Sequence, residues 1–502
     1  MALRASDIPQ PAPETGFDPD DWKAFSSLLH RAVDDMVDYI STVADRPAWQ
    51  PIPEQTKALF ETPLPETGIG LDRTYEHALQ NVTPYPTGNI HPRFWSWVGG
   101  TGTPHGIVAD LMISTMNAAG LGFDEAATTY VELQLLNWLK SMFDWPETAS
   151  GLLVSGGSMA NLVGLAVARN AMADFDVRNV GLGHQRASKL RFYASTETHS
   201  SVRKALELLG LGANALTLID IKADHSVDIR LLRQRIESDR AKGLLPIAIV
   251  ANAGTVNTGA IDPLDAIADL CAEQNLWLHV DGAFGAMAYI SELASHQVRG
   301  LQRADSLAFD LHKWMYQQYD IGCVLIRDQA QHRETFNITP AYLKKLGTGL
   351  ASGPTDFSAL GVQLSRSARA LRAWMTIQSE GIGKFRRLVD QNILQARYLS
   401  QRVVAEPQLE LAAPTILNIV NFRYRADGDD ASSDQLNQYI LEQLHERGIA
   451  TPSSTVLNDR FCIRVAICNH RSRRADFDAL IDGVLALGQE FESPSTLPNG
   501  SS

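Results

Sequence analysis

The organisation of the chain is clearest at residues 304–327, whose sequence is ADSLAFDLHKWMYQQYDIGCVLIR. Two apolar runs, Ser306–Phe309 and Gly322–Ile326, have the length and composition of short buried strands. The polar turn between them carries Lys313 directly after His312. A lysine on a turn between core strands faces a site, where burial can lower the pKa of its amine and prepare it for Schiff-base formation. For a His-Lys pair taken alone, an ordinary surface lysine is the alternative.

Two upstream stretches give this lysine a chemical context. Residues 276–285, LWLHVDGAFG, form an apolar strand that ends in an acid, Asp281. Residues 151–161, GLLVSGGSMAN, pass from a strand through a glycine-rich turn into a helix, and such a turn offers backbone N–H groups to a phosphate. Pyridoxal phosphate needs an acid for its ring nitrogen, a lysine for its aldehyde and a site for its phosphate, so the three stretches together indicate that cofactor.

With these motifs the chain resembles the group II pyridoxal-phosphate decarboxylases, which include aromatic L-amino acid and glutamate decarboxylases. The resemblance covers about residues 20–485 and rests on the motifs HPRF at 91–94, SGGSMAN at 155–161, THSS at 198–201, HVDGA at 279–283, HKW at 312–314, PAYL at 340–343 and RVAIC at 464–468. It implies a fold-type I enzyme that is a homodimer, with N-terminal segments lying across the partner.

The fold class predicted for residues 96–376 is α/β, because helical and strand patterns alternate there. A mostly parallel sheet between helices is expected from seven strands, at 152–155, 191–194, 216–219, 247–251, 277–280, 306–309 and 323–326. Residues 1–95 are expected to form an N-terminal helical arm for dimerisation, with a helix over 18–43 capped by Asp18. Residues 377–502 are expected to form a small α+β domain.

Composition bounds the partners and the compartment. The 502 residues include 45% apolar and 20% charged residues, as in a globular protein with a large core. The net charge of −13 argues against nucleic acid and anionic membranes as partners, and no apolar run is long enough for a membrane span. The four cysteines lie in or beside apolar segments without metal-ligand spacing. We therefore expect a cytoplasmic protein with free thiols and no metal.

The resemblance assigns roles around the cofactor ring. Lys313 is the expected Schiff-base lysine, and Asp281 the expected partner of the pyridinium nitrogen, although a turn aspartate is the alternative. Ala283 matches the family's small residue under the ring. His199 matches the histidine that stacks on the ring's outer face and acts in catalysis; a histidine that only caps the following helix is the alternative.

Gly157, Ser158 and His312 are expected to hold the phosphate, with Thr255 as a weaker polar contact; a plain strand-to-helix turn is the alternative for the glycines. Asp310 stands where many relatives have asparagine. Because an acid beside a phosphate is unfavourable unless it points away or is protonated, Asp310 is not included in the expected site.

Residues 328–358 contain several glycines and little periodicity, which predicts a loop that covers the site as a lid. In the family, a tyrosine in this context returns a proton to the substrate carbon, and Tyr342 is the expected donor; a tyrosine that packs the loop is the alternative. Trp97 is expected to wall the substrate pocket, with Phe123 supplied by the partner subunit. Arg93 could serve a substrate carboxylate.

The expected function is decarboxylation of an L-amino acid, an aromatic one first, to its amine. Three alternatives stay open: an aldehyde synthase or aminotransferase on the same fold, a decarboxylase of acidic or other non-aromatic amino acids, and a non-catalytic homologue.

Overall fold

The computed structural model describes residues 16–338, 345–426 and 430–493. The chain divides into two compact units, one formed by residues 1–46 with 52–86 and the other by residues 47–51 with 87–502. Within the described residues, no helix combines the length and apolar character that a bilayer span requires. The boundaries at 95/96 and 376/377 stay predictions; helix α12 (Ala370–Ala405) runs through the second of them.

The first unit contains helices α1 (Trp22–Ser41), α2 (Glu54–Ala58) and α3 (Leu71–Asn81). The predicted cap at Asp18 is wrong: Asp21 caps α1, because its Oδ1 accepts hydrogen bonds from the backbone of Lys23 and Ala24 at 2.9 and 3.0 Å. Polar contacts join α1 to α3, and neither helix buries a side chain.

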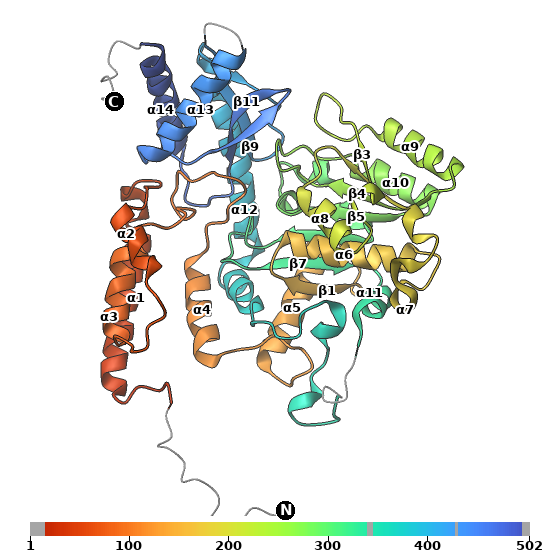
Figure 1. Ribbon diagram of the computed structural model, residues 1–502, viewed down its shortest axis with the longest axis horizontal. Coiled ribbons are helices and arrows are strands. Elements are labelled where there is room, and N and C mark those ends of the chain that lie inside the picture. Colours follow the sequence, from red (N-terminus) through yellow and green to blue (C-terminus); the bar gives the residue numbers. More distant parts are fainter. Residues whose placement is uncertain (1–15, 339–344, 427–429, 494–502) are drawn as a thin grey trace, which may run out of the picture. The chain divides into compact units, whose positions relative to one another are not determined.

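A seven-stranded sheet lies in the second unit, and all seven predicted strands are present. Figure 1 shows this sheet among the helices that accompany it. Its order is β1-β7-β6-β5-β4-β2-β3. The β2–β3, β2–β4, β4–β5 and β5–β6 pairs are parallel, whereas β7 is antiparallel to both neighbours. The strands are β1 (Ser150–Val154), β2 (Leu190–Ser195), β3 (Leu216–Ile219), β4 (Leu245–Asn252), β5 (Trp277–Asp281), β6 (Ser306–Asp310) and β7 (Gly322–Ile326).

Helices pack on this sheet, and α6, which begins at the glycine turn, contacts β4, β5, β6 and β7. The helices that alternate with the strands are α4 (Pro104–Met116), α5 (Ala127–Met142), α6 (Gly157–Met172), α8 (Ser200–Leu208), α9 (Ile229–Ala241) and α10 (Leu264–Gln274). A short helix, α7 (Val177–Val180), lies between α6 and β2. The loop expected over 328–358 is wrong at its start, where α11 (Gln329–Phe336) forms.

A second sheet of four antiparallel strands, in the order β10-β11-β9-β8, lies in the C-terminal part. Its strands are β8 (Leu409–Leu411), β9 (Ile419–Tyr424), β10 (Ser453–Leu457) and β11 (Arg460–Ala466), and α13 (Asp430–Glu446) and α14 (Arg474–Glu492) accompany them. Buried apolar side chains from β8, β9, β11, α12, α13 and α14 share one apolar core.

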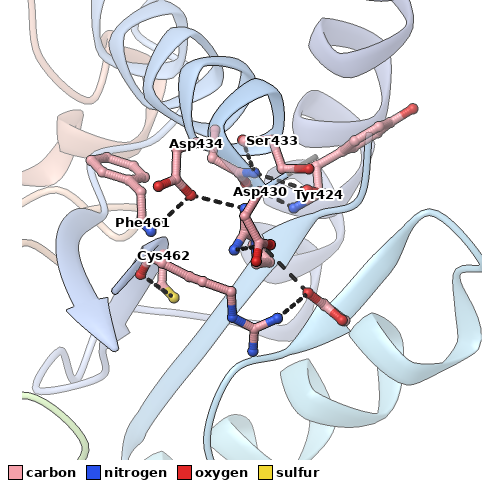
Figure 2. A network of polar contacts seen from close by, with 10 residues as sticks. Tyr424, Asp430, Ser433, Asp434, Phe461 and Cys462 are labelled. Atoms are coloured by element: carbon pink, nitrogen blue, oxygen red, sulfur yellow. Dashed lines mark hydrogen bonds and ion pairs between the residues drawn. The ribbon is translucent and has the colours of Figure 1, made fainter. Parts of the chain in front are cut away.

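Beside that core, Asp434 links α13 to the sheet (Figure 2). Its Oδ1 accepts hydrogen bonds from the Arg423 guanidinium and from the backbone of Phe461, both at 2.9 Å. Arg423 is buried, so this carboxylate supplies the countercharge that burial of a guanidinium requires.

Candidate active site

A cavity of about 470 Å³ lies where β1, β4, β5 and β6 end. Ligands of open α/β sheets bind outside the carboxyl ends of such strands. The cavity brings together eight residues that the sequence predicted for one site: Trp97, Gly157, Ser158, His199, Asp281, Ala283, His312 and Lys313. It also has lining residues outside that prediction, among them Val98, Asn161, Ser201, Asn252, Phe284 and Asp310.

Lys313 is paired with Asp310. The ammonium Nζ lies 2.9 Å from Asp310 Oδ2, and the acid is 1% exposed at the end of β6. Burial lowers the pKa of Lys313, but the charges of Asp310 and Asp281 and the Asp310 hydrogen bond outweigh it, so the pKa lies above the ordinary lysine value. The predicted fall of this pKa is wrong for the pair as it stands in the structure.

The glycine turn fits closely against neighbouring side chains. A Cβ on Gly156 would lie 3.1 Å from the His312 ring, and one on Gly157 would lie 3.0 Å from Asp310 Oδ2. A side chain at either position would crowd His312 or Asp310 where α6 begins. Because the first N–H groups of a helix lack partners within it, this end of α6 can receive a phosphate.

Asp281, the last residue of β5, is held by a chain of buried polar groups. Its Oδ2 accepts a 2.8 Å hydrogen bond from the Asn161 amide, and its Oδ1 accepts one from the Ala283 backbone. Asn161 Oδ1 lies 2.9 Å from His279 Nε2, and His279 Nδ1 lies 2.7 Å from the Ser306 hydroxyl. Burial lowers the pKa of His279 to about 4, so the ring is neutral and Nε2 carries the proton that Asn161 accepts.

His199 both caps a helix and faces the cavity. Its Nδ1 accepts a hydrogen bond from the Ser201 backbone at the start of α8, which leaves Nε2 as the ring nitrogen available to a ligand. Burial lowers the pKa of His199 more than the charge of Asp281 raises it. The neutral ring is therefore favoured near pH 7. His199 therefore caps α8 and also lines the cavity, while its stacking on the cofactor ring and its catalytic role stay predictions.

His312 lies between the glycine turn and Tyr319. Its Nδ1 accepts a 3.2 Å hydrogen bond from the Ile321 backbone, and its ring centroid is 4.5 Å from that of Tyr319. Burial lowers the pKa of His312. The proton on the neutral ring consequently sits on Nε2, which lies 3.7 Å from Asp310 Oδ2.

The cavity rim is fastened by a buried cation. Arg464 Nη1 donates a 2.6 Å hydrogen bond to the Trp97 carbonyl, while Nε and Nη2 donate to the carbonyls of Asn257 and Val256. Trp97 has a φ of 53°, a left-handed backbone that is rare for so large a residue. Arg464 thus holds Trp97 at the rim and joins β11 to two segments of the cavity wall.

Three other residues considered from the sequence, Thr255, Phe123 and Arg93, do not line the cavity. Thr255 is buried with its hydroxyl 3.1 Å from that of Thr258 and does not line the cavity. Phe123 and Arg93 are not among the lining residues either, so the role of Phe123 in a partner's site stays a prediction. Tyr342 lies outside the described residues.

The matching family model describes decarboxylases, and two relatives of this chain are decarboxylases. A model of the "Pyridoxal-dependent decarboxylase conserved domain" matches residues 53–425. An aromatic-L-amino-acid decarboxylase from Bacillus atrophaeus is 35% identical over 474 residues, which cover 92% of this chain and 95% of that protein. An L-2,4-diaminobutyrate decarboxylase from Rhizobium meliloti is 27% identical over 486 residues, with 96% and 95% covered.

Among solved structures, Oryza sativa TDC with PLP and tryptamine superposes with a TM-score of 0.87. It is 27% identical, and the match covers 95% of this chain and 100% of that one.

Proposed function

Because the chain belongs to the pyridoxal-dependent decarboxylases and uses pyridoxal phosphate, we propose that it removes the α-carboxyl group of an aromatic L-amino acid, giving an amine and CO2. The observation that carries this choice is the cavity wall. Its described lining contains Trp97, Val98, Val256 and Phe284 and no arginine, so an apolar ring is matched better than a second carboxylate.

The described residues fit the cofactor. Lys313 offers an amine, Asp281 offers a buried carboxylate fixed by Asn161, and the Gly156–Gly157 turn offers backbone N–H groups at a helix N-terminus. When bound, pyridoxal phosphate supplies an electron sink for the bond to the carboxyl group. In our proposal Lys313 holds its aldehyde carbon, Asp281 keeps its ring nitrogen protonated, and Ser158 and His312 bind its phosphate.

The remaining roles concern the substrate. We propose that His199, whose Nδ1 accepts the hydrogen bond of the helix cap, orients the substrate carboxylate, and that Tyr342 returns a proton to the α-carbon. Trp97 and Val98 form the wall for the substrate ring. A lid that excludes water and dioxygen would protect that proton transfer.

We also propose that the enzyme is a cytoplasmic homodimer. Helix α4 leaves Ile107, Val108, Leu111, Met112 and Met116 exposed, and exposed apolar side chains gathered on one helix favour an interaction surface there. Helices α1 and α3 of the first unit bury no side chain, which also favours a second subunit as their cover. All four cysteines are free and buried, as expected in a reducing compartment.

The test is CO2 release and amine formation across aromatic, acidic and diamino L-amino acids. We expect the highest kcat/KM for an aromatic one. A preference for glutamate or diaminobutyrate would contradict the substrate proposal, and aldehyde as the main product would favour an aldehyde synthase. Borohydride reduction followed by peptide mass spectrometry should place the cofactor on Lys313; any other lysine would refute the site assignment.

A further inference from the structure

Asp310 has an arrangement that its neighbours do not explain on their own. It is a buried acid whose Oδ2 is paired with Lys313, while Oδ1 is buried without a hydrogen-bond partner in the described part of the chain. The carboxyl group also lies against the glycine turn, since a Cβ on Gly157 would be 3.0 Å from Oδ2 and one on Gly156 would be 3.6 Å from Oδ1. An anion thus stands beside the place where the cofactor's phosphate would enter.

We propose that Asp310 is the proton acceptor for Lys313 during cofactor loading. Before loading, the carboxylate pairs with the ammonium. As the cofactor binds, the acid takes the lysine proton and then faces the phosphate as a neutral hydrogen-bond donor. This inference rests on the proposed assignment of Lys313 and is independent of which amino acid is the substrate.

The chemistry requires this proton to move. An ammonium has no lone pair, so Lys313 must lose one proton before nitrogen can attack the aldehyde carbon. The carbon–nitrogen double bond then forms as the carbonyl oxygen leaves as water with the two remaining amine protons. A carboxylate oxygen 2.9 Å from Nζ is within direct reach of the first proton.

Binding of the phosphate also favours transfer of a proton to Asp310. A carboxylate and a phosphate at one helix N-terminus carry like charges. Their repulsion favours protonation of one of the two groups. A protonated Asp310 removes that repulsion and gains an O–H donor, which its unpartnered oxygen can direct to an acceptor. The proton that Lys313 loses is the proton that Asp310 needs.

The other titratable groups around Lys313 and Asp310 are less suited to accept the proton that Lys313 loses. Lys313 is faced by His312 and Tyr319 from the β6–β7 connection, by Asp281 from β5 and by His199 from the start of α8. Burial lowers the pKa of both histidines and raises that of Tyr319. Asp281 is committed to Asn161 and the Ala283 backbone. The glycine turn itself brings no titratable side chain.

The first test locates the proton by infrared difference spectroscopy, loaded minus cofactor-free protein, for wild type and Asp310→Asn made with isotope-labelled aspartate. Wild type should gain a protonated-carboxyl band and lose a carboxylate band, and Asp310→Asn should show neither change. A wild-type spectrum without the protonated band, or a variant that keeps it, would overturn the proposal.

The second test concerns the ion pair in cofactor-free protein. The pH midpoint for acylation of Lys313, followed by peptide mass spectrometry, should fall by about one unit or more in Asp310→Asn, because the largest charge opposing the effect of burial is removed and only the weaker effects of Asp281 and Tyr319 remain. The exposed Lys204 on α8 is the internal control and should not change. An unchanged Lys313 midpoint would refute the role of Asp310. Borohydride labelling on a different lysine would instead refute the site assignment, so the two failures are distinguishable.

Discussion

The side-chain amide of Asn161 donates a 2.8 Å hydrogen bond to Oδ2 of Asp281 and thereby ties helix α6 to the end of β5. Asn161 is itself fixed by His279, whose other nitrogen contacts Ser306. The acid proposed for the cofactor's ring nitrogen is therefore oriented by a buried chain that reaches two strands, β5 and β6, and helix α6.

Asn161→Ala should weaken cofactor binding. The substitution removes a donor to a buried carboxylate and leaves His279 Nε2 without its acceptor, and hydrogen bonds to charged groups contribute about 1.5–3 kcal/mol. The dissociation constant, measured by visible absorbance, should rise about tenfold to a hundredfold. Asn170→Ala, near the other end of α6, is the matched control. Equal affinity in both variants would show that the network does not position Asp281.

The stability of the folded protein should decrease with falling pH because several histidines are buried in their neutral form. Burial lowers the pKa of His279, His332 and His470 to about 4, below the ordinary value of 6.5. Between these values the unfolded chain binds protons that the folded chain does not. The contribution of these neutral histidines to the free energy of unfolding is thus complete above pH 6.5 and is lost as pH falls toward 4.

His332→Gln tests this reasoning, because both nitrogens of His332 have buried partners, the Ser150 hydroxyl at 2.6 Å and the Leu360 carbonyl at 2.7 Å. Denaturant unfolding between pH 7 and 4.5 should show a loss of stability that is shallower in the variant by up to about 1.4 kcal/mol per pH unit. The exposed His296→Gln should keep the wild-type slope. Parallel curves for all three proteins would contradict the prediction.

Tyr342→Phe should change the product. General acid catalysis contributes about a hundredfold to ten-thousandfold, so amine formation should fall by that range. CO2 loss precedes the proton transfer and should fall less, with aldehyde appearing through reaction with dioxygen. Amine, aldehyde and CO2 are quantified together. Wild-type amine formation without aldehyde would leave His199 or a bound water as the better proton donor.

Charge on the face of α4 should break the proposed dimer. Leu111 and Met112 are exposed by 45% and 43%, and a glutamate at each would place charge in an apolar interface. Leu111→Glu with Met112→Glu should sediment as a monomer with reduced activity, whereas Val404→Glu, at an exposed site on α12, should not change the assembly. A double variant that stays dimeric would exclude this face.

Much of the fold was predictable because its strands are buried on both faces. Such strands are continuous apolar runs, and β5, β6 and β7 are buried along their whole length. Helix α11 was missed because its eight residues, QAQHRETF, have almost no apolar face. The strand β8 has only three residues, too few for a periodic pattern.

The site was predictable where chemistry follows a strand end, as at Asp281 and Lys313. The hydrogen-bond and ion-pair partners of the site residues were not predictable, because they depend on distances in the folded chain. Asp310 was expected outside the site on charge grounds, yet Lys313 supplies the countercharge that keeps it there. Thr255 was expected to reach the cofactor, but its hydroxyl is next to that of Thr258 three residues on. Asn161 and His279 stood inside quoted motifs, and only the folded chain joins them.

Arg464 recognises the main chain at the cavity rim, since its contacts with Trp97, Val256 and Asn257 all end on carbonyl oxygens. Every residue type carries such an oxygen, so these hydrogen bonds do not depend on the side chains of Trp97 and Val256, which line the cavity. An ancestral protein of this architecture could exchange its pocket wall residue by residue without detaching the C-terminal sheet. Substrate choice and structural integrity would then evolve as separate traits.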